Sequence, residues 1–585
     1  MNTDTSNTNE QVGGFRLLNV IGVGAQGKVW KAQCLEDLHG IVPVGTIVAL
    51  KIKYEHGDIL DAQWRKLESR INELKAIEHP NVVRYLGCFR EKALDHEKHV
   101  VVQEVLEGET LKERLDALNR WNPMKNRLGI DVDEGIDIVS QVASGLGHTA
   151  NLGIFHRDVK PGNIFLCRDG VVKLIDFGVA RQSDGTITEE GNIRGSWNYL
   201  APDFTDGVFR GDQQSDVFSV GVVLHEIITG RLPYQDSCGD DMTAFFARWA
   251  KVAEDSPIRI VSNTRRLLVG IDTIFDKTLT PDRNERYKDF AQLQDALGRV
   301  RFVEQKHDGK TFRRLQFIGE GGFGEVFKAR WLECNQPVAV KMLKNTDAGE
   351  RFHAEAEVMK ELDDPCFTRF IDFFEEDGRS FLVMSFLPGM PGSSLRDAIN
   401  RSKIEARLRN DALPSGGLPK DIVLAAFERY ARGLGLMHNH RPTIIHRDIK
   451  PSNLYYPDGC PERVAIMDFG IVKTGDASTV SGITPCTFDY APPEIVTTRD
   501  RGGPGMDIFA LGLCMYEALT GKMAYPRITG GQSGMFQFFE RCRLRKEPVF
   551  DDPRVVDDRD LLLLLRRMTD PDVSKRMTSA DEVAV

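Results

Sequence analysis

Each half of the chain repeats one order of hydrophobic and polar patterns. A β-rich stretch with a glycine turn comes first, and a charged segment then predicts a helix over 64–77 and again over 350–362. Another short β segment leads into a mainly helical second half, where two strand–loop–strand pieces are expected. Polar segments at 119–131 and 401–420 predict surface loops. The pattern therefore predicts an α+β fold in which each half begins with strands and continues with helices.

The two halves also correspond segment by segment. IGVGAQGKVWKA at Ile21 returns as IGEGGFGEVFKA at Ile318, and VALK ending at Lys51 returns as VAVK ending at Lys341. IFHRDVKPGNIF returns as IIHRDIKPSNLY, KLIDFGVA as AIMDFGIV, and SDVFSVGVVLHEIITGRLPY as MDIFALGLCMYEALTGKMAY. From VALK onward the copies are offset by 290 to 292 residues. So constant an offset indicates two tandem copies of one large domain, because a solenoid would show more and shorter repeats.

The junction between the copies is short. Segment 289–302 has apolar residues at helical spacing, and a strand-like segment begins at Phe312. We therefore expect a flexible tail over 1–14, a first domain over 15–301, a polar linker over 302–310 and a second domain over 311–585.

Composition narrows the class of protein. Of 585 residues, 41% are hydrophobic and 28% are charged, which is ordinary for soluble globular protein. The net charge of −10 argues against nucleic acid or an anionic membrane as the main partner. No apolar run approaches the roughly 18 residues that cross a bilayer, and the polar N-terminus predicts no signal peptide. Ten scattered cysteines, none in C-x-x-C spacing, disfavour a zinc ribbon and indicate a reducing, cytoplasmic location.

The glycine-rich turns are candidate phosphate sites. They consist of Gly22, Gly24 and Gly27 before Val29, and of Gly319, Gly321 and Gly324 before Val326. Glycines let backbone N–H groups approach a polyphosphate, but the pattern alone fits a tight turn equally well. A dinucleotide-binding fold needs a helix directly after the glycines. Because KVWKA and EVFKA are β-like, that interpretation is disfavoured.

The most specific pattern is His-Arg-Asp-x-Lys-Pro-x-Asn at 156–163 and 446–453, with Asp-Phe-Gly following at 176–178 and 468–470. Phosphoryl transfer needs a carboxylate to accept a proton, oxygen ligands for Mg²⁺ and cations beside the moving phosphoryl group. These motifs supply that set, and Lys51 and Lys341 each add a phosphate-anchoring cation at the end of a strand. Turn capping alone does not explain why the whole set recurs.

At these residues both copies resemble the eukaryotic-type protein kinase family, over nearly the whole chain. The resemblance implies bilobal domains with a β-rich N-lobe and a helical C-lobe, which use ATP with Mg²⁺ (or Mn²⁺) to phosphorylate protein substrates. The residue two places after the catalytic Asp is lysine in both copies, which matches the serine/threonine branch.

The resemblance also implies roles for individual residues. The catalytic residues are Asp158, Lys160, Asp448 and Lys450, and the metal ligands are Asn163, Asp176, Asn453 and Asp468. In the first copy the nucleotide contacts are Ile21, Gly22, Gly24, Gly27, Val29, Ala49, Lys51, Glu104 and Leu106. In the second they are Ile318, Gly319, Gly321, Gly324, Val326, Ala339, Lys341, Glu355, Ser385 and Leu387. Gln103 and Met384 fall at the gatekeeper position.

The substrate-facing end matches as well. In the family, an acidic residue after Ala-Pro pairs with a buried arginine, which here implies the pairs Asp203–Arg286 and Glu494–Arg576. Small-molecule kinases of related fold generally lack this segment, so that alternative is disfavoured. The residue before the catalytic-loop Asn is Gly162 or Ser452, which does not support a strong preference for basic substrates.

One departure separates the copies. The helix glutamate that pairs with the strand lysine is Glu355 in the second copy, but Arg70 stands there in the first. Glu73, on roughly the same helix face, and Glu68 are the candidate substitutes. The rival hypothesis is therefore a regulatory scaffold in which the first copy binds ATP as a pseudokinase.

Arg157 and Arg447 precede the catalytic aspartates, which in the family often means that a phosphate on the activation segment orders the site. We therefore expect autophosphorylation in at least one segment. The candidate hydroxyls are Ser183, Thr186, Thr188, Ser478, Thr479, Ser481 and Thr484.

Overall fold

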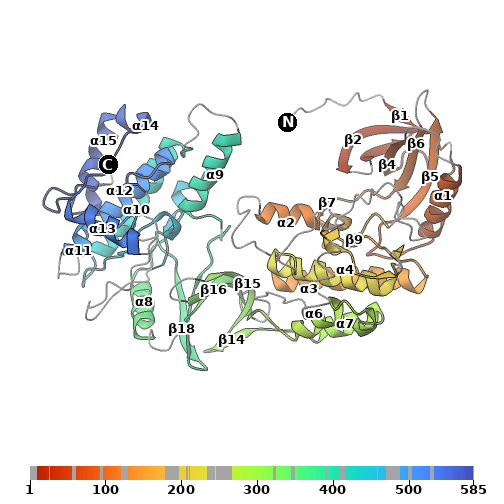
Figure 1. Ribbon diagram of the computed structural model, residues 1–585, viewed down its shortest axis with the longest axis horizontal. Coiled ribbons are helices and arrows are strands. Elements are labelled where there is room, and N and C mark those ends of the chain that lie inside the picture. Colours follow the sequence, from red (N-terminus) through yellow and green to blue (C-terminus); the bar gives the residue numbers. More distant parts are fainter. Residues whose placement is uncertain are drawn as a thin grey trace. The chain divides into compact units, whose positions relative to one another are not determined.

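The structure is a computed structural model that divides the chain into two compact units, with the change between Val303 and Glu304. It describes residues 10–24, 27–37, 39–55, 61–92, 97–119, 129–177, 197–205, 208–209, 211–233, 244, 266–320, 324–343, 349–390, 392–408, 416–457, 459–468, 488–497, 503–526 and 532–583. Each unit has a sheet lobe followed in sequence by a helical lobe, as Figure 1 shows. The predicted α+β class with two bilobal domains is confirmed.

The first unit begins with a six-stranded antiparallel sheet in the order β1-β2-β3-β4-β6-β5. Its strands are β1 (Gln11–Val12), β2 (Phe15–Gly24), β3 (Gly27–Cys34), β4 (Ile47–Glu55), β5 (Tyr85–Lys92) and β6 (Glu97–Gln103). Alternate residues point to one face of a strand, so Val48, Leu50 and Ile52 of β4 are all fully buried in one core. Helix α1 (Asp61–Lys75) packs beside β5 (Figure 1).

The second unit repeats this sheet in the same order, β14-β15-β16-β17-β19-β18. Its strands are β14 (Glu304–His307), β15 (Lys310–Glu320), β16 (Gly324–Trp331), β17 (Gln336–Leu343), β18 (Phe370–Glu376) and β19 (Arg379–Ser385). Helix α8 (Gly349–Glu361) packs beside β18 as α1 does beside β5. The two predicted charged helices therefore exist, with ends shifted by one to three residues.

Each helical lobe contains one helix that is buried along most of its length. The main helices of the first lobe are α2 (Leu111–Asn119), α3 (Val132–Asn151), α4 (Gln213–Thr229), α6 (Ile271–Thr278) and α7 (Phe290–Gly298). Those of the second are α9 (Leu395–Leu408), α10 (Lys420–His438), α11 (Glu494–Thr497), α12 (Gly505–Thr520), α13 (Gln532–Arg543), α14 (Pro553–Val556) and α15 (Arg559–Met568). Helices α4 and α12 are buried along nearly their whole length, which fits their almost continuous apolar sequences.

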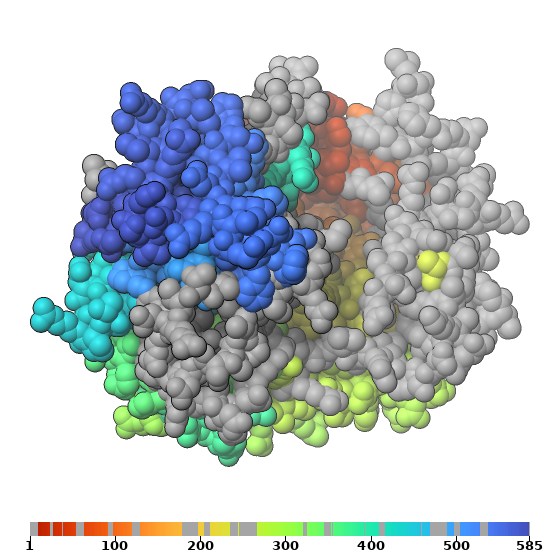
Figure 2. Space-filling view, turned by 60° about the vertical axis from the view of Figure 1, so that its left-hand side comes forward, coloured from red at the N-terminus to blue at the C-terminus, as the bar shows by residue number. Residues whose placement is uncertain are grey.

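Local signals define the ends of α4. The Asp212 side chain accepts hydrogen bonds from the backbone of Gln214 and Ser215, and Gly230 ends the helix in the left-handed region at φ 68°. Gly521 ends α12 in the same way at φ 69°. In Figure 2 the cyan-to-blue helical lobe of the second unit is one packed body, in which α12 contacts both α10 and α15.

Several predicted boundaries differ in the structure. Residues 302–310, predicted as a linker, contain the end of β13 (Arg301–Phe302), strand β14 and the turn into β15. Part of the predicted tail forms β1, which pairs with β2. The predicted loop 401–420 begins inside α9, which continues to Leu408. Some of the polar residues are buried and hydrogen-bonded, as Gln305 is to Arg314 and Arg401 to Gly392, so polarity alone did not indicate a loop.

Among the described ranges, no helix is both long and apolar enough to span a membrane.

Candidate active site

The glycine turns connect the first two long strands of each sheet. Across three neighbouring strands, Gly22 lies opposite Val29, and Val29 lies opposite Lys51. In the second unit Gly319, Val326 and Lys341 are paired in the same register. A side-chain carbon at Gly27 would lie 2.2 Å from the carbonyl oxygen of Ile52, so this close backbone crossing requires glycine.

Further predicted nucleotide contacts lie on the lysine strand and on the strand beside it. Ala49 is paired with Gln103, and Ala339 with Met384, and all four residues are buried. Ile21, Ile318, Leu106 and Leu387 are partly or fully accessible. The backbone N–H of Glu104 donates to Arg84 and that of Ser385 donates to Arg369, so these two N–H groups are already used within the fold. Gly321 lies outside the described residues, and Gly24 ends strand β2.

Asp216 of α4 supports the catalytic loop of the first unit through hydrogen bonds. Its two carboxylate oxygens accept hydrogen bonds of 2.7 Å from the backbone N–H groups of His156 and Arg157. These bonds stabilise Arg157 in the left-handed region, at φ 61°, where a non-glycine residue is strained. Burial raises the pKa of the Asp216 carboxyl to about 7.

In the second unit Asp507 accepts the equivalent bonds, at 2.8 Å, from His446 and Arg447. It also lies 2.9 Å from Nε2 of His438, a partner that the first unit does not have because Ala150 stands at the corresponding place in α3. Neither aspartate was assigned a role from the sequence. The sequence did contain a signal for this role, because each aspartate is the second residue of a recurring segment, SDVFSVG or MDIFALG.

Three predicted residues of the catalytic loop meet in each unit. In the first, Lys160 Nζ lies 2.7 Å and Asn163 Nδ2 lies 2.9 Å from Oδ2 of Asp158. The corresponding distances to Oδ2 of Asp448 are 2.7 Å from Lys450 and 3.0 Å from Asn453. In each unit, therefore, a lysine and an asparagine bind the same oxygen of a half-buried carboxylate.

The second metal-ligand candidates, Asp176 and Asp468, follow short strands and adopt left-handed φ values of 62° and 57°. Phe177 is fully buried and its ring lies 4.6 Å from that of His156. The hydroxyl of Tyr85 accepts a hydrogen bond of 3.3 Å from the Phe177 N–H. Phe469 lies outside the described residues, so the contacts of this phenylalanine are given for the first unit alone.

The strand lysine of the second unit pairs as predicted. Lys341 Nζ lies 2.9 and 3.2 Å from the two oxygens of Glu355 and 3.5 Å from Asp468. The lysine and the glutamate are 7% and 5% exposed. Although burial alone would lower the pKa of Lys341, Glu355 and Asp468 raise it above its ordinary value. The lysine is therefore charged and oriented.

The strand lysine of the first unit binds a different acid. Lys51 Nζ lies 2.7 Å from Oδ1 of Asp176. Arg70 binds Glu73 at 2.9 Å, and its other terminal nitrogen lies 3.4 Å from the carbonyl oxygen of Phe155. Glu73, half exposed, therefore neutralises Arg70, and the arginine connects α1 to the residue before the catalytic loop.

The predicted acid–arginine pairs are confirmed. Arg286 Nη1 lies 2.8 Å from Asp203, which also accepts a 2.7 Å hydrogen bond from Ser215. Arg576 binds Glu494 through two hydrogen bonds of 2.5 and 3.0 Å. All four side chains are at most 9% exposed.

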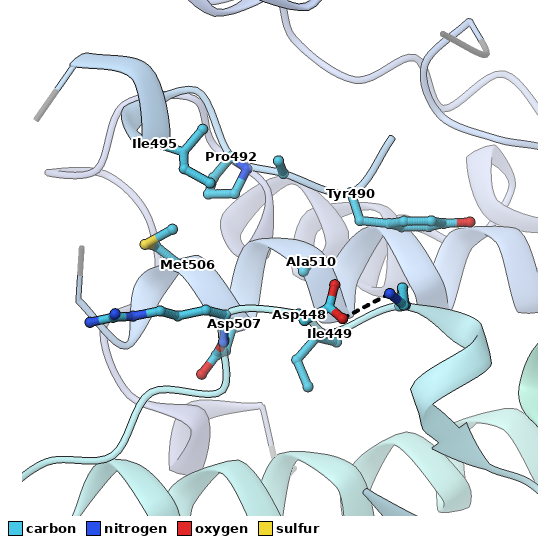
Figure 3. A pocket seen from close by; sticks show the side chains of 11 residues that line it. Asp448, Ile449, Tyr490, Pro492, Ile495, Met506, Asp507 and Ala510 are labelled. Atoms are coloured by element: carbon cyan, nitrogen blue, oxygen red, sulfur yellow. Dashed lines mark hydrogen bonds and ion pairs between the residues drawn. The ribbon is translucent and has the colours of Figure 1, made fainter. Parts of the chain in front are cut away.

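A shallow hollow lies beside Asp448. It is lined by the catalytic loop, the first residues of α12 and the segment from Tyr490 to Ile495. Figure 3 shows the Asp448 carboxylate pointing into this space, below Tyr490 and Pro492.

The candidate ligands, an amide and a carboxylate in each unit, carry the oxygen atoms that Mg²⁺ and Mn²⁺ prefer. The carboxylates of Asp176 and Asp468 lie 2.7 and 3.5 Å from the strand lysines. In the described ranges no group of three or more His, Cys, Asp or Glu could hold a metal by itself. Oxygen atoms of a nucleotide would have to complete the coordination, as is usual for Mg²⁺ beside phosphates.

Comparison with known proteins agrees with this geometry. The protein kinase domain family matches the chain twice, over residues 15–295 and 312–584. The putative ribosomal protein S6 kinase alpha-1 of Caenorhabditis elegans is 24% identical, over 97% of this chain and 76% of that protein. Human ribosomal protein S6 kinase alpha-3 is 25% identical over 87% of this chain and 74% of its own length. Serine/threonine-protein kinase PrkC of Bacillus subtilis is 31% identical, over 51% of this chain and 44% of its own length.

The two matched ranges cover nearly all of the chain, so it belongs to the protein kinase family and carries two kinase domains. The family uses ATP with a divalent metal ion and acts on protein substrates.

Proposed function

We propose that the chain is a tandem serine/threonine protein kinase and that both units transfer the γ-phosphoryl group of ATP to protein hydroxyls. The observation that carries the proposal is the recurrence of one Asp–Lys–Asn arrangement, with distances of 2.7 to 3.0 Å, in both units. The serine/threonine names of the relatives support the choice of acceptor.

In this mechanism Asp158 or Asp448 accepts the proton of the substrate hydroxyl while the hydroxyl oxygen attacks the γ-phosphorus. Lys160 or Lys450, 2.7 Å from that carboxylate, offsets negative charge on the moving phosphoryl group. Lys51 or Lys341 orients the phosphates, and the glycine-rich turn covers them.

Asn163 with Asp176, and Asn453 with Asp468, would hold Mg²⁺ (or Mn²⁺). When bound, the cation neutralises phosphate charge and favours departure of the ADP oxygen. Activity should vanish with EDTA and return with Mg²⁺, and activity that survived full chelation would contradict this assignment.

The location that we propose is cytoplasmic. Among the described residues eight cysteines are free thiols, and burial raises the pKa of six of them: Cys34, Cys88, Cys167, Cys366, Cys514 and Cys542. Unpaired, unreactive thiols suit a reducing compartment. Protein substrates are the proposed partners, and no nucleic acid is expected.

A second candidate, a regulatory scaffold with a pseudokinase first unit, is favoured by Arg70, which stands at the helix position of Glu355 and pairs with Glu73. Incubation with radiolabelled ATP and Mg²⁺, with and without a general protein substrate, separates the candidates. A kinase labels the added protein, whereas a scaffold binds ATP without labelling it.

Autophosphorylation remains a prediction, because the candidate hydroxyls of both activation segments lie outside the described residues. Mass spectrometry of active protein tests it, and an absence of phosphate on both segments would contradict it.

A further inference from the structure

Helix α13 of the second unit holds a buried arginine against the segment that follows residue 487. Arg541, near the end of this helix, is 9% exposed. Its Nη2 donates hydrogen bonds to the carbonyl oxygen of Phe488 and, at 3.2 Å, to that of Ala491. Residues 488–490 form a turn, so one guanidinium nitrogen binds the carbonyl at its start and the carbonyl just after it. Arg541 therefore closes this turn.

Two aromatic rings cover the guanidinium. Its central carbon lies 4.4 Å from the ring centre of Tyr525 and 5.2 Å from that of Phe538, and Phe538 also stacks on Phe488 at 4.6 Å. In the part of the chain that the structure describes, Arg541 forms no ion pair, and its Nη1 has no hydrogen-bond partner. Burial lowers the pKa of this arginine. Carbonyl oxygens and ring faces, rather than a paired carboxylate, stabilise the buried cation.

Arginine contributes something here that an apolar side chain would not. The space between two rings suits a side chain such as methionine, and a buried cation without a paired carboxylate is destabilising unless its donors are hydrogen-bonded. Arg541 uses its donors on the turn at 488–490. Tyr490 and Pro492 line the shallow hollow beside Asp448, and Figure 3 shows both of them above its carboxylate. The turn that Arg541 closes is therefore next to the proposed base.

The arginine also recurs in the sequence. FFERC at 538–542 returns as FFARW at 245–249, so Arg248 stands in the first copy where Arg541 stands in the second. Residues 245–249 lie outside the described residues, so the contacts of this arginine are given for the second unit alone.

We propose that Arg541 is a positioning residue for the protein substrate, because by closing the turn at 488–490 it holds the segment beside Asp448 in the shape that receives a peptide. This inference rests on the proposed kinase function. Helix α13 contributes none of the predicted nucleotide contacts. Loss of the Arg541 hydrogen bonds should therefore impair the use of a peptide and leave the use of ATP intact.

The test uses the full chain with Asp158→Asn, so that turnover reports on the second unit. Transfer to a serine peptide is compared with the slow hydrolysis of ATP by water, which needs no peptide. Arg541→Met keeps an unbranched side chain between the rings and removes the donors. It should raise KM for the peptide about tenfold and leave both KM for ATP and the hydrolysis rate within about twofold of the parental values.

Hydrogen exchange gives a second readout that needs no turnover. In the Arg541→Met protein the backbone amides of 488–492 should exchange faster, whereas those of α12 should keep their parental rates. Arg543→Met is the matched control, because Arg543 lies on the same helix and is exposed. It should change neither the peptide KM nor the exchange.

A second variant decides the case if Arg541→Met does not fold. Arg541→Lys keeps the cation between the rings, but the shorter side chain reaches the two carbonyls less well. It should raise the peptide KM and speed exchange at 488–492, each by less than methionine does. Parental values of both in a folded variant would overturn the proposal, and so would an equal loss of peptide transfer and ATP hydrolysis. If neither variant folds, Arg541 serves the fold alone and the proposal is wrong.

The exchange experiment separates this proposal from the kinase function. If the Asp158→Asn protein binds ATP but transfers nothing to any peptide, the kinase proposal fails for the second unit. Exchange at 488–492 then still decides whether Arg541 holds the turn.

Discussion

Lys51 and Lys341 occupy the same register position in their sheets, yet different acids neutralise them. In the second unit Glu355 of helix α8 binds the lysine, and the pair is nearly inaccessible. In the first unit Asp176 binds it, and both side chains are more exposed, at 18% and 35%. The helix position has changed to Arg70, which binds Glu73 and Phe155 instead of the lysine.

The comparison shows that one fold can keep its catalytic loop unchanged while the support around it changes. The Asp–Lys–Asn distances agree within about 0.1 Å between the units. The differences lie in the helix beside the sheet, in the cation of α2 or α9, and in the partners of Asp216 and Asp507. These are the places where the units should differ in activity and regulation.

The largest effect is expected from removing each base alone. Asp448→Asn should remove most of the transfer to an added substrate, because loss of the general base lowers turnover of the second unit at least ~100-fold while ATP binding is retained. The transfer that remains then comes from the first unit. Asp158→Asn should cost less, since Arg70 stands in the first unit at the helix position where the second unit has Glu355. If Asp158→Asn is inactive and Asp448→Asn is near the parental rate, the ranking is wrong and Arg70 is not a lesion.

Removing the buried acid of the substrate-facing segment should destabilise the second unit more than the first. Glu494→Gln leaves Arg576 buried without its two-point partner, at a cost of about 3–5 kcal/mol. Asp203→Asn should cost less, because Arg286 loses a single hydrogen bond to that carboxylate. Hydrogen exchange of helices α12 and α4 measures each unit separately, and equal losses would contradict the distinction.

The stability of the first unit should fall as pH rises from about 4 to 7. Burial raises the pKa of Asp216 from 3.8 to about 7, so the folded state holds this proton more tightly than the unfolded state does. The contribution is complete below pH 4 and is lost as the carboxyl ionises. It is on the order of 4 kcal/mol, because the pKa rises by about three units and one unit corresponds to about 1.4 kcal/mol.

Asp216→Asn, which cannot ionise, should remove this pH slope from hydrogen exchange of α4. If the slope persists in the variant, another group is responsible.

The smallest effect concerns the helix acids. In an Asp158→Asn protein, Glu355→Gln should lower turnover of the second unit about tenfold, because Lys341 loses its orienting partner. In an Asp448→Asn protein, Glu73→Gln should change turnover of the first unit less than about twofold, since Glu73 binds Arg70. Arg70→Glu tests the converse, and a gain in first-unit turnover would show that the missing acid limits it.

The sequence by itself determined the duplication, the α+β order and the catalytic constellation. These depend on short-range patterns, such as the HRD-x-K-P-x-N spacing, which place reacting groups on one loop whatever surrounds it. It also predicted the pairs Asp203–Arg286 and Glu494–Arg576, through the resemblance, although their partners lie about 80 residues apart.

Only the tertiary structure decided which partner each charge takes. Glu73 and Asp176 were both available to Lys51, and the choice depends on the direction of α1, which no local pattern encodes. Lys112 of α2 and Arg396 of α9 each lie two residues after a hydroxyl side chain that bonds an acid in the first helical turn. Lys112 nevertheless faces solvent, whereas Arg396 reaches Glu517, 121 residues further along the chain. A buried charge is paired by whichever side chain the packing brings within reach, and packing is settled by the whole unit.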